Sequence, residues 1–251
     1  METIYRTQIA AKDLKTLANV AKAVNEEVTL GLNAEAEKQN QRFRFWSKDE
    51  QKKCALTGSL VTEYEDTEGA VNVRLPTSNL YDTLATFGAK DMVEVVVSED
   101  KANEENPLSM GFTNLRTGET RSMTVQEAEG DDQPYSGKLG KGPTCNVPSK
   151  ELNKVVSAFK KYADVVEVKI DSGFLVTYHS RNGEDSWHYL TEESEGSGSA
   201  KFSTNLLAAA ATACKNAGKM VTVTLSPTAM RLSSATETVA CRLYVVASTP
   251  I

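Results

Sequence analysis

The stretch KDLKTLANVAKAV, residues 12–24, has a counterpart in KELNKVVSAFKKY, residues 150–162. In the first stretch, apolar residues recur at the spacing of an amphipathic helix, at Leu14, Leu17, Ala18, Ala21 and Val24. The second stretch repeats that spacing with Leu152, Val155, Val156, Phe159 and Tyr162. Lys12 and Lys22 correspond to Lys150 and Lys160. The chain is therefore predicted to be an internal duplication, with the same helix early in each half.

The segments around these helices follow the same order in both halves. Each half is predicted to run strand, helix, three strands, strand, helix, three strands. The second helix of each half opens at Ser78 (residues 78–87) and at Thr204 (ending at Lys215), and Ser149 is the predicted N-cap of helix 150–162. Predicted strands cover residues 3–9, 28–32, 42–46, 54–64, 92–97, 108–114, 120–126, 144–147, 165–170, 174–179, 186–190, 220–225, 230–234 and 239–246.

A polar, glycine-rich segment at residues 127–142 separates the halves and has the composition of a linker. We therefore predict an N-terminal domain at 1–126 and a C-terminal domain at 143–251. Many antiparallel strands with few helices favour an α+β fold whose helices gather on one face of the sheets.

Composition and motifs argue against catalysis and metal binding. The only histidines, His179 and His188, lack ligand spacing, and the glycines at 137–142 do not form a phosphate-binding loop. The four cysteines are far apart and show no metal or disulfide pattern, which predicts reduced thiols in an intracellular protein. The net charge of −6 counts against a nucleic-acid binder unless the positive charges cluster.

The sequence resembles the sliding-clamp family of the proliferating-cell nuclear antigen (PCNA) type. The resemblance is carried by residues 201–251, with Phe202, an alanine-rich helix to Lys215, a strand at 221–226 and the closing LYVVASTPI. Residues 147–180 and 3–32 also resemble the family in the order of their predicted helix and strands. The resemblance implies two tandem clamp domains and a homotrimeric ring with antiparallel sheets outside and four helices on its inner face. It also implies a non-enzymatic processivity factor without cofactors, located in the nucleus of a eukaryotic cell and otherwise in the cytoplasm.

In such a ring the helices face double-stranded DNA without reading its sequence. Lysines on the polar sides of the predicted helices are the expected phosphate contacts, at Lys12, Lys15, Lys22, Lys150, Lys154, Lys161, Lys215 and Lys219. Acidic residues gather in loops instead, which answers the objection from net charge. The chain departs from the family in helix 78–87, which has Asp82 and no cation. It also has Thr16, Ser157 and Asn205 where the family often has a basic residue.

The resemblance further implies two protein interfaces. DNA polymerase, the clamp loader and other proteins with a clamp-binding motif would insert a peptide at Phe45, Cys54, Leu56, Tyr135, Leu139, Pro227, Val245, Val246, Ala247 and Ile251. Subunits would join by pairing strand 120–126 with an edge strand at 185–192, through Met123, Val125, Trp187 and Tyr189.

Three other readings remain open. One is a subunit of a heterotrimeric checkpoint clamp, and another is a monomeric viral polymerase processivity factor. The third is a structural protein built from a duplicated sheet domain, with no role on DNA.

Overall fold

The computed structural model describes residues 1–36, 42–49, 51, 53–62, 64–65, 70–103, 108–128, 139, 142–180, 183–191 and 194–248. The chain forms two compact units, and the main division, between Pro134 and Tyr135, falls inside the predicted linker. Unit 1 also contains Glu237–Val239, and unit 2 contains Lys48–Leu56. None of the helices in the described part of the chain has the length and apolar character needed to span a bilayer.

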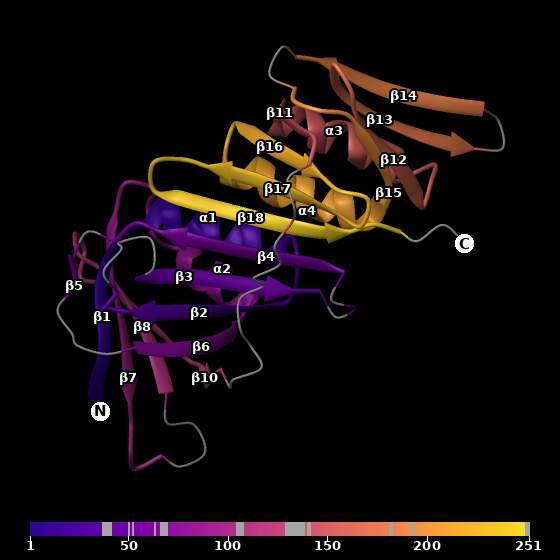
Figure 1. Ribbon diagram of the computed structural model, residues 1–251. Coiled ribbons are helices and arrows are strands. Elements are labelled where there is room, and N and C mark those ends of the chain that lie inside the picture. The colour runs from indigo at the N-terminus through magenta and orange to yellow at the C-terminus, as the bar shows by residue number, and fades with distance from the viewer. Residues whose placement is uncertain are drawn as a thin grey trace. The chain divides into compact units, whose positions relative to one another are not determined.

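Unit 1 alternates short strands with two helices (Figure 1). Its elements are β1 (Glu2–Ala10), α1 (Ala11–Lys22), β2 (Glu27–Asn33), β3 (Phe43–Lys48), β4 (Cys54–Leu60, of which Thr57–Leu60 belong to unit 1), β5 (Tyr64–Glu65), β6 (Ala70–Pro76), α2 (Thr77–Ala85), β7 (Met92–Glu99), β8 (Leu108–Asn114), β9 (Thr120–Thr124) and β10 (Gln126–Glu127).

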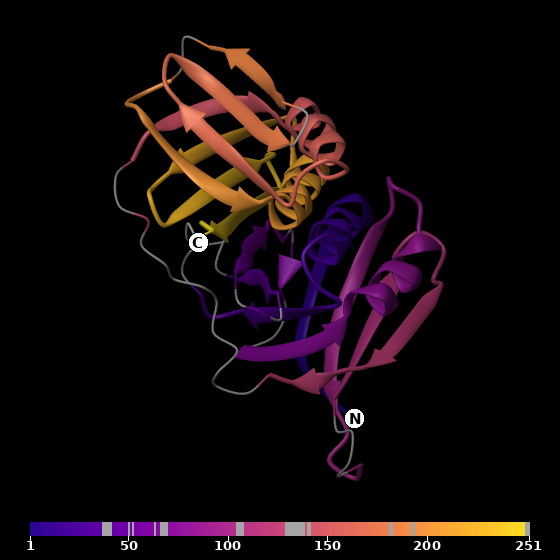
Figure 2. The same ribbon diagram turned by 90° about the vertical axis from the view of Figure 1, so that its right-hand side faces the viewer.

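Unit 2 repeats this plan, and its two helices lie side by side in Figures 1 and 2. Its elements are β11 (Thr144–Pro148), α3 (Ser149–Phe159), β12 (Val165–Ile170), β13 (Gly173–Ser180), β14 (Gly183–Leu190), β15 (Gly198–Ser203), α4 (Thr204–Ala217), β16 (Met220–Leu225), β17 (Ala229–Ala235) and β18 (Val239–Val246).

The sheets of the two units have the same strand order. In unit 1 the orders are β1-β7-β8-β9 and β6-β2-β3-β4, with the two-residue strands β5 and β10 added beyond β1 and β6. In unit 2 they are β11-β16-β17-β18 and β15-β12-β13-β14. The predicted duplication and the α+β class are therefore confirmed. The strand predicted before the second helix of each half, for which no range was given, is β6 in unit 1 and β15 in unit 2.

Each helix begins at an equivalent hydrogen bond. The first helical amides of α1 and α2, at Ala11 and Thr77, donate to the carbonyls of Asp91 (2.9 Å) and Glu26 (2.7 Å). In unit 2, Ser149 and Thr204 donate in the same way to Lys219 (2.9 Å) and Asp164 (2.8 Å). Every acceptor lies in the turn that follows the other helix of the same unit. The bond therefore satisfies one of the amides that a helix start leaves without an intrahelical partner.

The apolar sides of the helices and every second residue of the strands form the core of each unit. Leu14, Leu17, Ala18 and Ala21 of the predicted stripe are at most 1% exposed. The strands show the expected alternation, with Val93, Val95 and Val97 of β7 fully buried. Helix α4 is lined by buried alanines, which allow close approach to its neighbours α3, β16 and β17.

Two strand predictions were too long. The predicted strand 54–64 ends at Leu60, because the chain then crosses to the other sheet, where β5 pairs with β1. The predicted strand 120–126 ends at Thr124, and Gln126 and Glu127 pair with β6 instead.

Two predictions about α3 were also wrong. Ser149 is the first residue of α3 and does not cap it, because its Oγ donates to the carbonyls of Gly218 and Lys219 (3.0 Å to the latter). The predicted stripe ends at Phe159, where the helix stops. Tyr162 is 65% exposed and stacks on Tyr178 with a centroid separation of 5.9 Å.

Gly31 in β2 provides a test of packing in unit 1. A Cβ at this position would lie 2.6 Å from Cζ3 and 2.8 Å from Cη2 of Trp46, a ring that is only 4% exposed. We expect Gly31→Ala to lower the free energy of unfolding by about 1–3 kcal/mol, the usual cost of overpacking. Urea denaturation measures this. The control is Gly111→Ala in β8, whose Cβ would meet nothing nearer than the Val96 carbonyl at 3.9 Å. Equal effects of the two changes would contradict the steric argument.

Candidate nucleic-acid interface

Most of the lysines predicted to face DNA are exposed on or next to the helices. Lys12 on α1, Lys150 and Lys154 on α3, and Lys215 on α4 are exposed, as are Lys161 and Lys219 in the turns after α3 and α4. The described residues provide no hydrogen bond or ion pair to any of these six ammonium groups. Their side chains can therefore swing toward an anion without breaking an existing contact. Their role in DNA binding remains a prediction.

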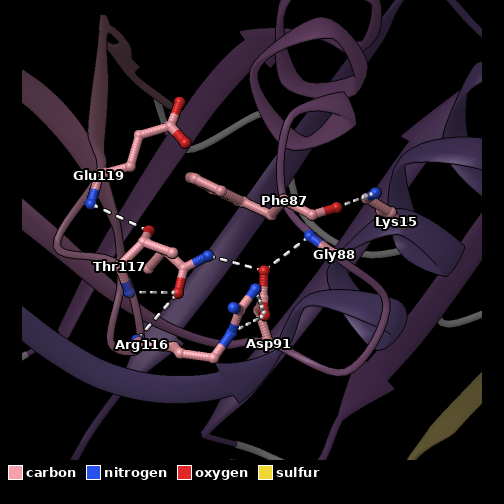
Figure 3. Close-up of polar contacts among 8 residues, drawn as sticks. Lys15, Phe87, Gly88, Asp91, Arg116, Thr117 and Glu119 are labelled. Carbon is pink, nitrogen blue, oxygen red and sulfur yellow. Dashed lines mark hydrogen bonds and ion pairs between the residues drawn. The ribbon is translucent and has the colours of Figure 1, made fainter.

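Lys15 is placed differently from the other predicted lysines. It is half-buried, and its Nζ donates to the carbonyl of Phe87 (Figure 3). The same Nζ lies 3.5 Å from the carbonyl of Ala85, to which it also donates. Ala85 is the last residue of α2, and Phe87 follows two residues later. A cation at a helix C-terminus neutralises the partial negative charge of the terminal carbonyls. Lys15 thus joins α1 to the end of α2.

Lys22 also reaches from α1 to α2. Its Nζ lies 4.7 Å from the centroid of the Tyr81 ring, a cation–π distance. Tyr81 is 37% exposed. The side of α2 around Tyr81 carries Asp82 and no cation of its own, in agreement with the departure noted in the sequence.

In unit 2 the two helices are joined by a neutral hydrogen bond. Thr212 Oγ1 of α4 donates to Asn153 Oδ1 of α3 at 2.8 Å. Asn153 is the fifth residue of α3, as Lys15 is of α1, and Thr212 is the ninth residue of α4, as Ala85 is of α2. The same two positions therefore connect the helices in both units, through different chemistry.

A buried carboxylate holds the turn that follows α2, and the sequence did not single it out. Asp91 is 4% exposed and accepts hydrogen bonds from the Gly88 amide (2.7 Å), Asn114 Nδ2 (2.7 Å) and Arg116 Nε (2.9 Å) (Figure 3). The Asn114 side chain in turn accepts from the backbone amides of Arg116 and Thr117 at 2.9 and 3.2 Å. The Gly88 amide first, then the Arg116 guanidinium and the Asn114 amide, hold the pKa of the Asp91 carboxyl below its usual range.

Residues of the predicted peptide pocket differ in their accessibility. Phe45, Cys54, Leu56 and Val245 are at most 1% exposed and belong to the core. Pro227 and Val246 are exposed, and Ala247 and Leu139 are half-buried. Tyr135 and Ile251 lie outside the described residues. Of the predicted set, the described surface thus retains Pro227, Val246, Ala247 and Leu139.

The last residue of β18 and the two residues after it are tied to their own unit by successive backbone amides. Those of Val246, Ala247 and Ser248 donate to the carbonyls of Lys53 (2.8 Å), Thr228 (2.9 Å) and Lys201 (2.7 Å). A docked peptide that paired with this segment would therefore have to use its carbonyls.

The two predicted interface strands each end a sheet. No described strand pairs with the outer side of β9 or β14. On these strands Met123, Trp187 and Tyr189 are half-buried, and Trp187 stacks on Tyr189 with a centroid separation of 6.0 Å. Val125 is 3% exposed and lies just beyond β9, and its amide donates to the Leu108 carbonyl at 3.1 Å. The predicted strand 185–192 corresponds to part of β14, which ends at Leu190, and Glu192 is outside the described residues.

The cysteines have the character of core residues. All four are free and buried. Burial, together with the Asp49 carboxylate, raises the pKa of the Cys54 thiol to about 12, and a hydrogen bond with Cys241 followed by burial raises that of Cys214. Such thiols are poor nucleophiles and poor metal ligands at neutral pH. The described residues contain no cluster of three or more His, Cys, Asp or Glu side chains that could hold a metal ion.

Solved structures share the whole of this fold. PCNA from A. fulgidus, in a complex described as the C-terminal region of FEN-1 bound to it, is 14% identical, with a TM-score of 0.79 over 99% of this chain and 100% of that one. PCNA from Entamoeba histolytica is 10% identical, with a TM-score of 0.81 over 98% of this chain and 100% of that one. No protein-family model matches the sequence, and no curated protein matches it. The chain thus has the fold of PCNA-type sliding clamps, as the resemblance implied.

Replacing Asp91 tests the network in unit 1. Because the folded-state pKa is depressed, the carboxylate stabilises the fold above its ordinary pKa of about 4, and this contribution is lost as the pH falls through the folded-state value. We expect Asp91→Asn to be less stable than wild type at neutral pH, with a difference that shrinks below about pH 4. Urea unfolding across a pH series measures it. Glu119→Gln, which removes only an exposed ion pair with Arg121, is the control. A difference that persists unchanged in strong acid would show that the charge is not responsible.

Proposed function

We propose that this chain, which has the fold of the PCNA-type sliding clamps, is itself a sliding clamp. It would encircle double-stranded DNA and tether a DNA polymerase and other replication or repair proteins, without catalysing a reaction. The observation that carries the proposal is the set of exposed lysines on the helices and following turns of a duplicated clamp unit, at Lys12, Lys150, Lys154, Lys161, Lys215 and Lys219.

The chemistry of these lysines suits a protein that slides. Phosphate contacts supply affinity without sequence information, because every base pair presents the same backbone charges. Lysine is a point charge on a flexible stem, so it can pass from one phosphate to the next without having to match a fixed geometry. A few such contacts are sufficient when a closed ring prevents dissociation.

We propose that partner proteins bind at the surface around Pro227, Val246 and Ala247. Support comes from the A. fulgidus PCNA, which was solved with the C-terminal region of FEN-1 bound to it. Val246 is 40% exposed at the end of β18, so its apolar side chain is accessible to a partner. A clamp loader and a polymerase would use the same surface in turn, by adding an extended peptide beside the chain after β18.

We propose that three copies close into a ring through β9 and β14. An edge strand exposes unpaired backbone groups, and head-to-tail pairing satisfies them in every copy only if the ring closes. Met123 on β9 and the Trp187–Tyr189 stack on β14 are half-buried in one chain and would be covered in the trimer. Such a clamp would work wherever its DNA lies, in the nucleus of a eukaryotic cell and otherwise in the cytoplasm.

The mass in solution tests the assembly. We expect light scattering behind a sizing column to give three times 27.3 kDa at micromolar concentration. A chain that stays monomeric at every concentration would exclude the homotrimer. It would favour a subunit of a heterotrimeric clamp or a monomeric processivity factor.

Single substitutions on the edge strands test how the ring closes. We expect Met123→Lys in β9 and, independently, Tyr189→Lys in β14 to convert the trimer to monomers, because each would bury an unpaired ammonium at the interface. Ser98→Lys, half-buried on the inner strand β7 of the same sheet as β9, should leave the trimer intact. Circular dichroism confirms that each variant is folded. Trimers that survive both edge changes would exclude this pairing.

A further inference from the structure

The two units differ in the charge of their helix pairs. Helices α3 and α4, with the turns that follow them, carry six lysines against the two carboxylates Glu151 and Asp164. Helices α1 and α2 with their turns carry four lysines, and these are matched by four carboxylates, at Asp13, Glu26, Asp82 and Asp91. The helix pair of unit 1 is therefore formally neutral, whereas that of unit 2 is positive.

In unit 1, Lys15 is already engaged by the protein. Its ammonium group satisfies the carbonyls of Ala85 and Phe87, where the C-terminus of α2 leaves acceptors without intrahelical donors. If Lys15 turned to a phosphate, these carbonyls and the negative end of α2 would lose their cation. A phosphate contact from Lys15 would thus come at the expense of a contact within the fold.

The duplication shows that this position joins helices in both units. The residue equivalent to Lys15 is Asn153, which has no charge to offer DNA and is bonded to Thr212 at the position equivalent to Ala85. Lys154, the second lysine of α3, is one residue further along and exposed, with no described hydrogen-bond or ion-pair partner. In unit 2, Asn153 joins the helices and the neighbouring Lys154 remains exposed. In unit 1, the residue that joins the helices is itself a lysine, Lys15.

Lys22 is also directed toward α2. Its ammonium lies over the Tyr81 ring, next to Asp82 in sequence. The equivalent residue in unit 2 is Lys160, in the turn after α3, where Lys161 follows directly. Both lysines of unit 1 that face α2 are therefore used to hold the α1–α2 pair together.

We infer that the DNA contact of each chain is carried mainly by unit 2, through Lys150, Lys154, Lys161, Lys215 and Lys219, whereas Lys15 and Lys22 act as helix-bracing residues. This inference rests on the proposed clamp function. On this view the lysines of the two units have different roles: those of unit 2 contact DNA, and Lys15 and Lys22 of unit 1 hold α1 and α2 together.

Two matched double variants separate these tasks. Lys154→Met with Lys215→Met removes two charges from unit 2, and Lys15→Met with Lys22→Met removes two from unit 1, while methionine keeps most of the side-chain length. Fluorescence anisotropy of a labelled duplex, titrated at a series of low salt concentrations, gives the slope of log affinity against log salt. Each lost phosphate contact reduces that slope by about 0.9.

We expect the magnitude of the slope to be smaller in the unit 2 variant than in wild type by at least about 0.9. The urea midpoint of this variant should equal that of wild type. The unit 1 variant should keep the slope, and its urea midpoint should fall by on the order of 0.2 M because α2 loses its terminal cation. An equal or larger loss of slope in the unit 1 variant would overturn the inference and leave the clamp function standing. A wild-type protein that does not bind the duplex at the lowest salt would instead reject the clamp function itself, and the inference with it.

Discussion

Four hydrogen bonds between helix starts and turns set the geometry of both units. In each unit, the first amide of one helix donates to a carbonyl in the turn that follows the other helix. The two helices thereby hold each other at both ends, and each bond also places the first residue of the strand that follows the turn. Because these junctions join each helix to the turn after its neighbour, residues that make them are constrained even where they are polar, as at Asp91 and Ser149.

The duplicated units preserve these junctions and differ around them. Unit 1 stabilises the turn after α2 with a carboxylate, a guanidinium and an amide, and joins its helices through a lysine. Unit 2 uses a serine hydroxyl at the start of α3 and a threonine–asparagine bond between its helices. At the start of α4 the buried Thr204 hydroxyl has no hydrogen-bond partner among the described residues, whereas the Thr77 hydroxyl donates to Glu26 at 3.0 Å. The repeat thus conserves geometry more strictly than chemistry.

The sequence predicted the elements well where apolar residues are periodic, as in α1, β12, β16 and β18. It failed where tertiary contacts end an element, because neither the crossing after Leu60 nor that after Thr124 has a glycine or proline to mark it. For the site, a helical wheel showed which lysines leave the core, but it could not show that Lys15 meets the end of a helix 70 residues away. The Asp91 network was missed for the same reason, since its partners come from two separate turns.

The contrast between Asp91 and the alanines of α4 gives the two halves different sensitivities to their surroundings. Unit 1 depends in part on the Asp91 carboxylate, which accepts hydrogen bonds from a guanidinium and two neutral amides around one turn, and acid weakens these contacts by protonating it. Unit 2 depends on close helix packing by Ala210, Ala211 and Ala213, all fully buried, which acid does not remove. Acid should therefore loosen the N-terminal half first. Unfolding of the chain would then lose its cooperativity and separate into two steps.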